Sequence, residues 1–69
     1  MTVMNKLETA LASAKGLAAS LKTFSLDTDD QNAKQMFNML SSNAENMAQM
    51  IESRVNYLKS EEPQYNQQQ

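Results

Sequence analysis

Apolar residues recur at alternating steps of four and three along the first part of the chain, which is the spacing of one face of an α-helix. Thr2 can cap such a helix at its start, and the pattern fades near Ser25. The apolar stripe consists of Val3, Leu7, Ala10, Ala14, Leu17, Leu21 and Phe24, with Met4, Leu11 and Ala18 beside it. The pattern predicts a first helix over about residues 3–25.

A second helical pattern follows a short polar segment. Thr28 and Gln31 have the spacing of a capping box, and Asp29 and Asp30 suit the positive end of a helix dipole. The apolar positions that follow are Ala33, Phe37, Leu40, Ala44, Met47, Ala48, Ile51, Val55 and Leu58. This pattern predicts a second helix over about residues 29–61.

The two helices make one structural unit. We expect an all-α, antiparallel two-helix hairpin over residues 1–62 and a flexible polar tail over residues 63–69, because Pro63 cannot continue a helix. At about 1.5 Å per residue, the second helix is expected to extend about two turns beyond the first.

The second helix carries a further set of side chains directly beside its apolar stripe when it is projected at about 100° per residue. The two sets together cover nearly half of the circumference. One antiparallel neighbour buries only a narrow seam, so this arc predicts a homodimeric four-helix bundle. The residues expected at the dimer interface are Met36, Met39, Leu40, Asn43, Met47, Met50, Arg54 and Tyr57. The methionines can be ordinary core filler or an adaptable surface for a different partner.

The back of the first helix has neither charged nor bulky residues. Small residues four positions apart, at Ala12, Gly16 and Ser20, would let another backbone approach closely. This surface is either a second docking face or a solvated surface with a tolerated glycine. The candidate partner face consists of Thr9, Ala12, Ser13, Gly16, Ser20 and Thr23.

Size and composition favour association over chemistry. A lone core in a chain of 69 residues rarely supplies more than roughly 3 to 5 kcal/mol, and short chains compensate with disulfides, metals or oligomerisation. Cys and His are absent, which leaves oligomerisation. Without them, an enzyme would depend on Ser, Lys and carboxylates on exposed helices. We therefore expect no enzymatic activity, no cofactor and no metal.

Charge distribution narrows the class of partner. The net charge is −2, and the six basic residues are scattered rather than arranged as the stripe that a nucleic acid requires. The polar arc of the second helix balances both signs, so direct lipid binding is not expected. No apolar run approaches a membrane span and no signal peptide is recognised, which predicts a cytoplasmic protein.

Several segments resemble a family of short bacterial proteins, catalogued as domain of unknown function 1657. These segments are Met1-Thr2-Val3, Leu11-Ala12-Ser13-Ala14-Lys15-Gly16, Ala19-Ser20-Leu21, Ala33-Lys34 with Phe37, Ile51 and Arg54, and Glu61-Glu62-Pro63-Gln64-Tyr65. The resemblance implies a protein of endospore-forming bacteria, often encoded beside stage V sporulation channel proteins and membrane proteins that resemble spore heat-resistance determinants. It implies no activity and no site residues. The Met-rich second helix and the Asn-Gln-Gln-Gln ending depart from the family.

Together these observations predict a non-enzymatic helical association module. It would act as a homodimer and as an accessory or scaffold in sporulation, located in the cytoplasm, the forespore or the spore interior, in contact with a membrane-protein complex. The alternative is a helical bundle that binds a small molecule or lipid in a cavity lined by methionine.

Overall fold

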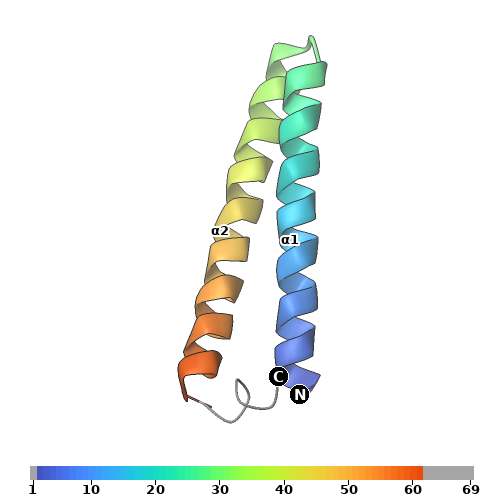
Figure 1. The fold of residues 1–69 in the computed structure, drawn as a ribbon. Coiled ribbons are helices and arrows are strands. Elements are labelled where there is room, and N and C mark those ends of the chain that lie inside the picture. The colour runs from blue at the N-terminus through green and yellow to red at the C-terminus, as the bar shows by residue number, and fades with distance from the viewer. Residues whose placement is uncertain (1, 62–69) are drawn as a thin grey trace.

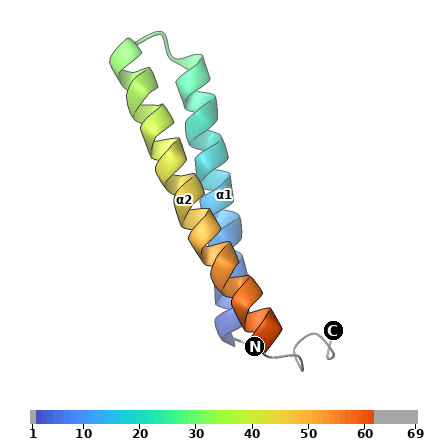
Figure 2. The ribbon, with the colours of Figure 1, turned by 90° about the vertical axis from the view of Figure 1, so that its left-hand side faces the viewer.

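The computed structural model describes residues 2–61, which form two α-helices packed side by side in opposite directions. The first helix, α1, spans Thr2–Asp27, and the second, α2, spans Gln31–Glu61. Views at right angles show the two helices in contact along their length, joined at one end by a short loop (Figures 1 and 2). The predicted all-α hairpin is confirmed. The side chain of Thr2, expected as a cap, and the tail over residues 63–69 lie outside the part that the structure describes.

The hairpin is a rod rather than a ball. Its principal extents are 50 × 15 × 14 Å, and its radius of gyration is 15.7 Å, whereas a compact chain of this length has one of about 11 Å. A rod has little interior for its length. Most side chains of both helices are therefore exposed.

The loop is fixed by a cap that differs from the predicted one. Asp30 precedes α2, its carboxylate accepts a hydrogen bond from the Asn32 amide at 3.2 Å, and its carbonyl accepts one from the Lys34 amide at 2.9 Å. Asp30 is thus the N-cap residue. The Thr28 hydroxyl instead accepts a hydrogen bond from the Asp30 amide at 3.2 Å, within the loop. The predicted capping box of Thr28 and Gln31 is wrong, because the helix begins two residues later than that box requires.

Lys34 connects the loop end of the two helices. Its ammonium group donates a hydrogen bond to the Ser25 carbonyl at 2.9 Å, near the carboxyl end of α1. A cation at this position satisfies one of the last carbonyls and complements the negative end of the helix dipole. Lys34 belongs to the polar arc predicted for the second helix, which was expected to face solvent, but in the structure its side chain is only half-exposed.

The seam between the helices is built from small residues. Among the side chains that the structure describes, eight are buried, and their spacing follows steps of three and four or sums of these steps, as in a coiled coil. They are Met4, Ala14, Ala18 and Ser25 on α1 and Ser41, Ala44, Ala48 and Val55 on α2. The half-buried positions between them are Leu7, Leu11 and Leu21 on α1 and Phe37, Ile51 and Leu58 on α2.

A buried hydrogen bond shows how closely the helices approach. The Ser41 hydroxyl on α2 donates to the Ala18 backbone carbonyl on α1 at 3.0 Å. A side chain as short as serine reaches the backbone of a neighbouring helix only when the axes are close, and alanine and serine at the contact permit this. Large side chains are consequently displaced to the borders of the seam.

The predicted face of the first helix is wrong by about one residue position. Val3, Leu17 and Phe24 were expected in the stripe, yet they are 63%, 51% and 49% exposed. On α2, Ser41 occupies the place expected for Leu40, which is exposed. The competing stripe has the same periodicity, and the close approach of the helices selects the one richer in small residues.

The predicted overhang of α2 is also smaller than expected. The helices have 26 and 31 residues, a difference of about 7.5 Å or just under a turn and a half. Leu58 is still half-buried and Met4 is buried, so the seam continues almost to the open end. The unmatched apolar surface lies along the hairpin rather than beyond it.

Candidate association surface

The two long borders of the hairpin, on either side of the seam, carry different kinds of residue. On both helices, the residues that immediately precede one row of seam residues are mostly apolar, and in an antiparallel pair these rows meet on the same border. We call this border, with the adjoining row of α2, the apolar edge. It consists of Val3, Ala10, Leu17 and Phe24 on α1 and Met36, Leu40, Asn43, Met47, Met50, Arg54 and Tyr57 on α2.

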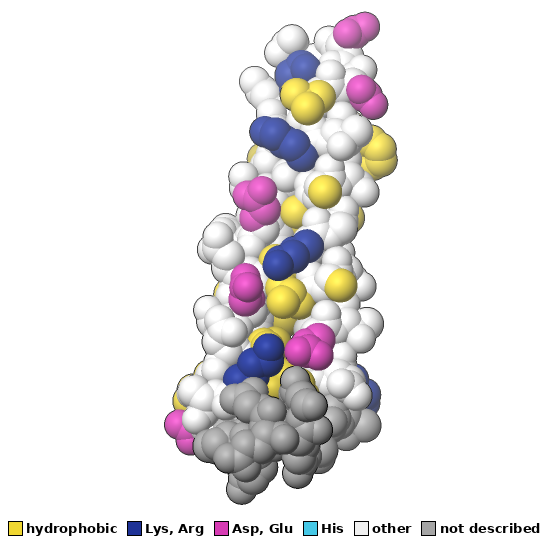
Figure 3. All heavy atoms as spheres, viewed as in Figure 1, with side chains coloured by type: hydrophobic (Ala, Val, Ile, Leu, Met, Phe, Trp, Pro, Cys, Tyr) yellow, Lys and Arg dark blue, Asp and Glu magenta, His cyan; other side chains and the backbone are white. Residues whose placement is uncertain are grey.

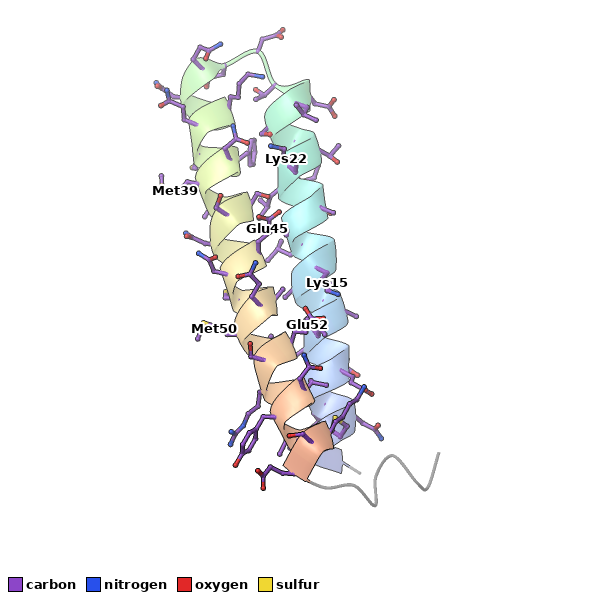
Figure 4. All side chains as sticks on the ribbon, turned by 60° about the vertical axis from the view of Figure 1, so that its left-hand side comes forward. Lys15, Lys22, Met39, Glu45, Met50 and Glu52 are labelled. Carbon is purple, nitrogen blue, oxygen red and sulfur yellow. The ribbon has the colours of Figure 1, made fainter. Side chains whose placement is uncertain are left out.

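The apolar edge carries most of the exposed bulky apolar side chains of the described hairpin. Met36, Met47 and Met50 are 50%, 52% and 72% exposed, and Tyr57 is 50% exposed. From Met36 to Tyr57 the edge extends for about 32 Å. All eight residues predicted at the dimer interface are exposed, and seven belong to this edge; Met39 is one row further from the seam. In Figure 4, Met39 and Met50 point away from α1.

In this hairpin most of the buried hydrophobic side chains are small, whereas many of the large ones are exposed. Four of the six buried hydrophobic residues are alanine, whereas Val3, Leu17, Phe24 and the edge methionines remain in solvent. Burying an alanine contributes little, since about 25 cal/mol is gained per Å² of apolar surface. The hairpin thus leaves outside the residues that could stabilise it most.

Aromatic contacts anchor both ends of the apolar edge. The rings of Phe24 and Phe37 lie 5.7 Å apart between centroids, which fixes Phe24 against α2 near the loop. At the other end, the Arg54 guanidinium carbon lies 5.1 Å from the centroid of the Tyr57 ring. This is within the range of a cation–π contact, so the guanidinium lies against the apolar surface rather than standing away from it.

The opposite border is charged. Acidic and basic side chains follow the groove between α1 and α2, with apolar side chains between them (Figure 3). Lys59 and Glu8 approach to 3.9 Å, with both side chains largely exposed. Because the helices are antiparallel, moving seven residues forward on α1 corresponds to moving seven residues back on α2. These steps lead from Glu8 and Lys59 to Lys15 and Glu52, and then to Lys22 and Glu45. The repeat places opposite charges across the groove and favours this register over its neighbours.

A shallow hollow of about 530 Å³ opens in this charged groove. Lys15 and Lys22 border it from α1 and Glu45 and Glu52 from α2, as Figure 4 shows. It exists because the seam there is formed by alanine. The remaining lining residues are Ala18, Ala19, Ala48 and Gln49.

Neither this hollow nor a second one supports the expected methionine-lined cavity. The second has about 320 Å³ and is lined by Asn5, Lys6, Thr9 and Ala10. Methionine lines neither of the two. Among residues 2–61, no group of three or more His, Cys, Asp or Glu residues is placed to hold a metal ion. Within the same residues, no helix combines the length and the apolar character that crossing a membrane requires.

The candidate partner face on the back of α1 is fully exposed. This holds for Thr9, Ala12, Ser13, Gly16, Ser20 and Thr23. A Cβ atom built on Gly16 meets no atom within 4 Å, so no contact with α2 requires a glycine there. Close approach between backbones occurs instead at the seam, through Ala18 and Ser41. Docking of a partner on this face stays a prediction.

Replacing Gly16 with alanine should stabilise the protein. Alanine is favoured over glycine by about 1 kcal/mol in a helix interior, and the added methyl group has open space. For a chain of this size, the melting temperature should rise by about 4 °C or more. Thermal unfolding followed by circular dichroism measures the shift. A decrease in melting temperature would show that a contact outside the described hairpin requires the glycine.

The comparisons with known proteins give one match. No curated protein and no solved structure matches the chain. Residues 7–55 match the family described as "Protein of unknown function (DUF1657)". These residues include most of both helices, the loop and all of the apolar edge except Val3 and Tyr57. The chain therefore belongs to the DUF1657 family.

Proposed function

We propose that this protein is a non-enzymatic association module that pairs with a second copy through the apolar edge to form a four-helix bundle. The supporting observation is the row of half-exposed Leu17, Phe24, Met36, Met47 and Met50 beside a seam of alanine and serine. Monomeric proteins rarely leave long, contiguous apolar surfaces in water. Covering this edge supplies the bulky core that the hairpin lacks.

A second copy is the occupant that fits this edge best. Two identical edges have the same length, and the four helices enclose their apolar residues, as in bundle proteins. Methionine side chains, with three rotatable bonds each, adapt readily to such an interface. The charged edges, with Lys15, Lys22, Glu45 and Glu52, then face solvent on the outside of the bundle.

The cellular role we propose is that of an accessory or scaffold protein in spore-forming bacteria, in contact with a membrane-protein complex. The support comes from the sequence resemblance and the genomic setting that it implies. Comparing the amount of the protein in sporulating and vegetative cells tests this role, and equal amounts in both would contradict it.

The mass in solution tests the association. The chain has a mass of 7.7 kDa, and light scattering at micromolar concentration should give about twice that value, because the hydrophobic gain of covering the edge exceeds the cost of association. A folded, helical protein with the monomer mass at this concentration would refute the proposed dimer.

A further inference from the structure

The two ends of the apolar edge carry opposite charge. Ser41 is hydrogen-bonded to Ala18, and Lys34 to Ser25. In both pairs the two residue numbers add up to 59, which gives the register of α1 against α2. By the same rule, Lys6 lies at the level of Ser53, next to Arg54, and Asp27 lies at the level of Asn32. Lys6 and Asp27 belong to the row of α1 that borders the apolar edge on its outer side. The edge is thus framed by two cations near the open end and by a carboxylate near the loop.

Neighbouring charges reinforce this asymmetry at the loop. Asp29 and Asp30 are exposed beside Asp27, while the Lys34 ammonium is held against the Ser25 carbonyl. Near the open end, Glu61 shares a row with Arg54 but lies seven residues further on, past the last apolar residue of the edge. The cations are therefore the charges that border the apolar surface there.

We propose that the two copies pair in antiparallel orientation about a twofold axis at Asn43, so that Asp27 of each copy lies against Arg54 and Lys6 of the other. This inference rests on the proposed homodimer and specifies its geometry. The apolar residues in the middle of the edge then lie against the middle of the edge of the other copy; Met36, for example, faces Met50. Charge complementarity selects the orientation, because opposite charges meet at both ends of the interface.

A parallel dimer has the opposite electrostatics. Its twofold axis runs parallel to the hairpins, so each residue lies at the same level as the identical residue of the other copy. Arg54 would then lie beside Arg54, and the carboxylates of Asp27, Asp29 and Asp30 beside the same three groups. Like charges at a close interface disfavour association, so both ends oppose the parallel pairing.

The centre of the edge independently indicates the same axis. Contact between Arg54 of one copy and the level of Asn32, where Asp27 lies, in the other requires an axis midway between these positions, at residue 43. The residue found there is Asn43, the uncharged polar residue among the edge positions. An amide carries both donors and an acceptor, so Asn43 can form a hydrogen bond with its own copy across a twofold axis. A single polar residue in an apolar interface is a known way of fixing register and orientation.

Cross-linking tests this orientation directly, because the chain contains no cysteine. Chains carrying Met36→Cys and chains carrying Met50→Cys, one of them with a mass tag, are mixed and oxidised. The antiparallel dimer predicts the mixed disulfide as the main product, since these positions face each other. Disulfides between identical chains as the main product would overturn the proposal.

The variant Asn43→Cys separates failure of the orientation from failure of the dimer. Position 43 faces itself in both orientations, so its cross-link requires only that the dimer forms through this edge. Efficient cross-linking at position 43 without the mixed product refutes the antiparallel orientation alone. Absence of all cross-links, together with a monomer mass for the unmodified chain, refutes the homodimer itself.

Charge reversal distinguishes the two orientations. In the antiparallel dimer, Arg54→Glu places a carboxylate against Asp27 of the other copy, and the dissociation constant should rise about tenfold. Adding Asp27→Lys to the same chain should restore most of the affinity. Sedimentation equilibrium measures both effects, and circular dichroism checks that the hairpin stays helical. An unchanged or tighter dimer for Arg54→Glu would overturn the proposal, since in the parallel dimer this change only exchanges one like-charge pair for another.

Discussion

Replacing Met50 with glutamate is expected to convert the protein from dimer to monomer at micromolar concentration. Met50 is 72% exposed in the hairpin, so the substitution removes little packing from the isolated chain. In the dimer it would bury a carboxylate against an apolar surface, at a cost of about 3 kcal/mol or more per copy. This corresponds to a dissociation constant raised by at least about a hundredfold.

Light scattering and circular dichroism measure the two consequences of this substitution. The mass should fall to that of one chain, and helicity should decrease, because the hairpin then loses the core that the second copy supplied. The matched control is Asn46→Glu, which adds the same charge on the same helix at an exposed position outside the apolar edge. If both variants keep the dimer mass, the interface lies elsewhere.

Replacing Ala44 with leucine is expected to destabilise the hairpin by about 1–3 kcal/mol, although the substitution adds apolar surface. Ala44 is 3% exposed in the seam. The Ser41 to Ala18 hydrogen bond, one turn away, keeps the helices close. Three additional carbon atoms must either push the helices apart, which breaks this hydrogen bond, or adopt strained rotamers.

The free energy of unfolding in urea, at one fixed protein concentration, measures this effect. The control is Ala12→Leu, the same chemical change at an exposed position of α1, which should alter the free energy of unfolding by less than about 0.5 kcal/mol. An Ala44→Leu variant as stable as the unmodified protein would show that the seam can widen freely. In that case close approach would not explain why the large residues lie outside.

The sequence predicted the architecture well because hydrophobic periodicity is a property of each helix alone. Steps of three and four identify a helix whichever of two adjacent stripes is buried. The choice between stripes depends on the neighbour, and here the neighbour comes close enough for Ser41 to reach the backbone at Ala18. Periodicity alone favours Leu17 and Phe24 as core residues because they are large and apolar. Only the alignment of small residues on the two helices indicates a narrow seam, and these residues are Ala14, Ala18, Ala44 and Ala48.

Of the apolar edge, the sequence predicted the part on α2 but not the part on α1. The methionine row of the second helix was recognised because the helix had more apolar surface than one neighbour could cover. The contribution of α1, from Val3 to Phe24, was missed because those residues were assigned to the hairpin's own seam. Close approach through small residues was predicted only for the back of α1 around Gly16, and the seam of alanine and serine was not anticipated. The cap was misplaced because Thr28, Asp29 and Asp30 are all good capping residues, and the loop length decides among them.

The antiparallel register has a consequence for how the hairpin opens. Contacts near the loop close short segments of chain: Lys34 and Ser25 are nine residues apart in the sequence, whereas Ser41 and Ala18 are 23 residues apart. The entropy lost on closing a segment grows with its length, so the seam frays from the open end, where Tyr57 and Arg54 lie. In the dimer proposed above, each fraying end rests on the firmly closed loop end of the other copy. Each chain would then hold the two helices of the other chain together at their open end.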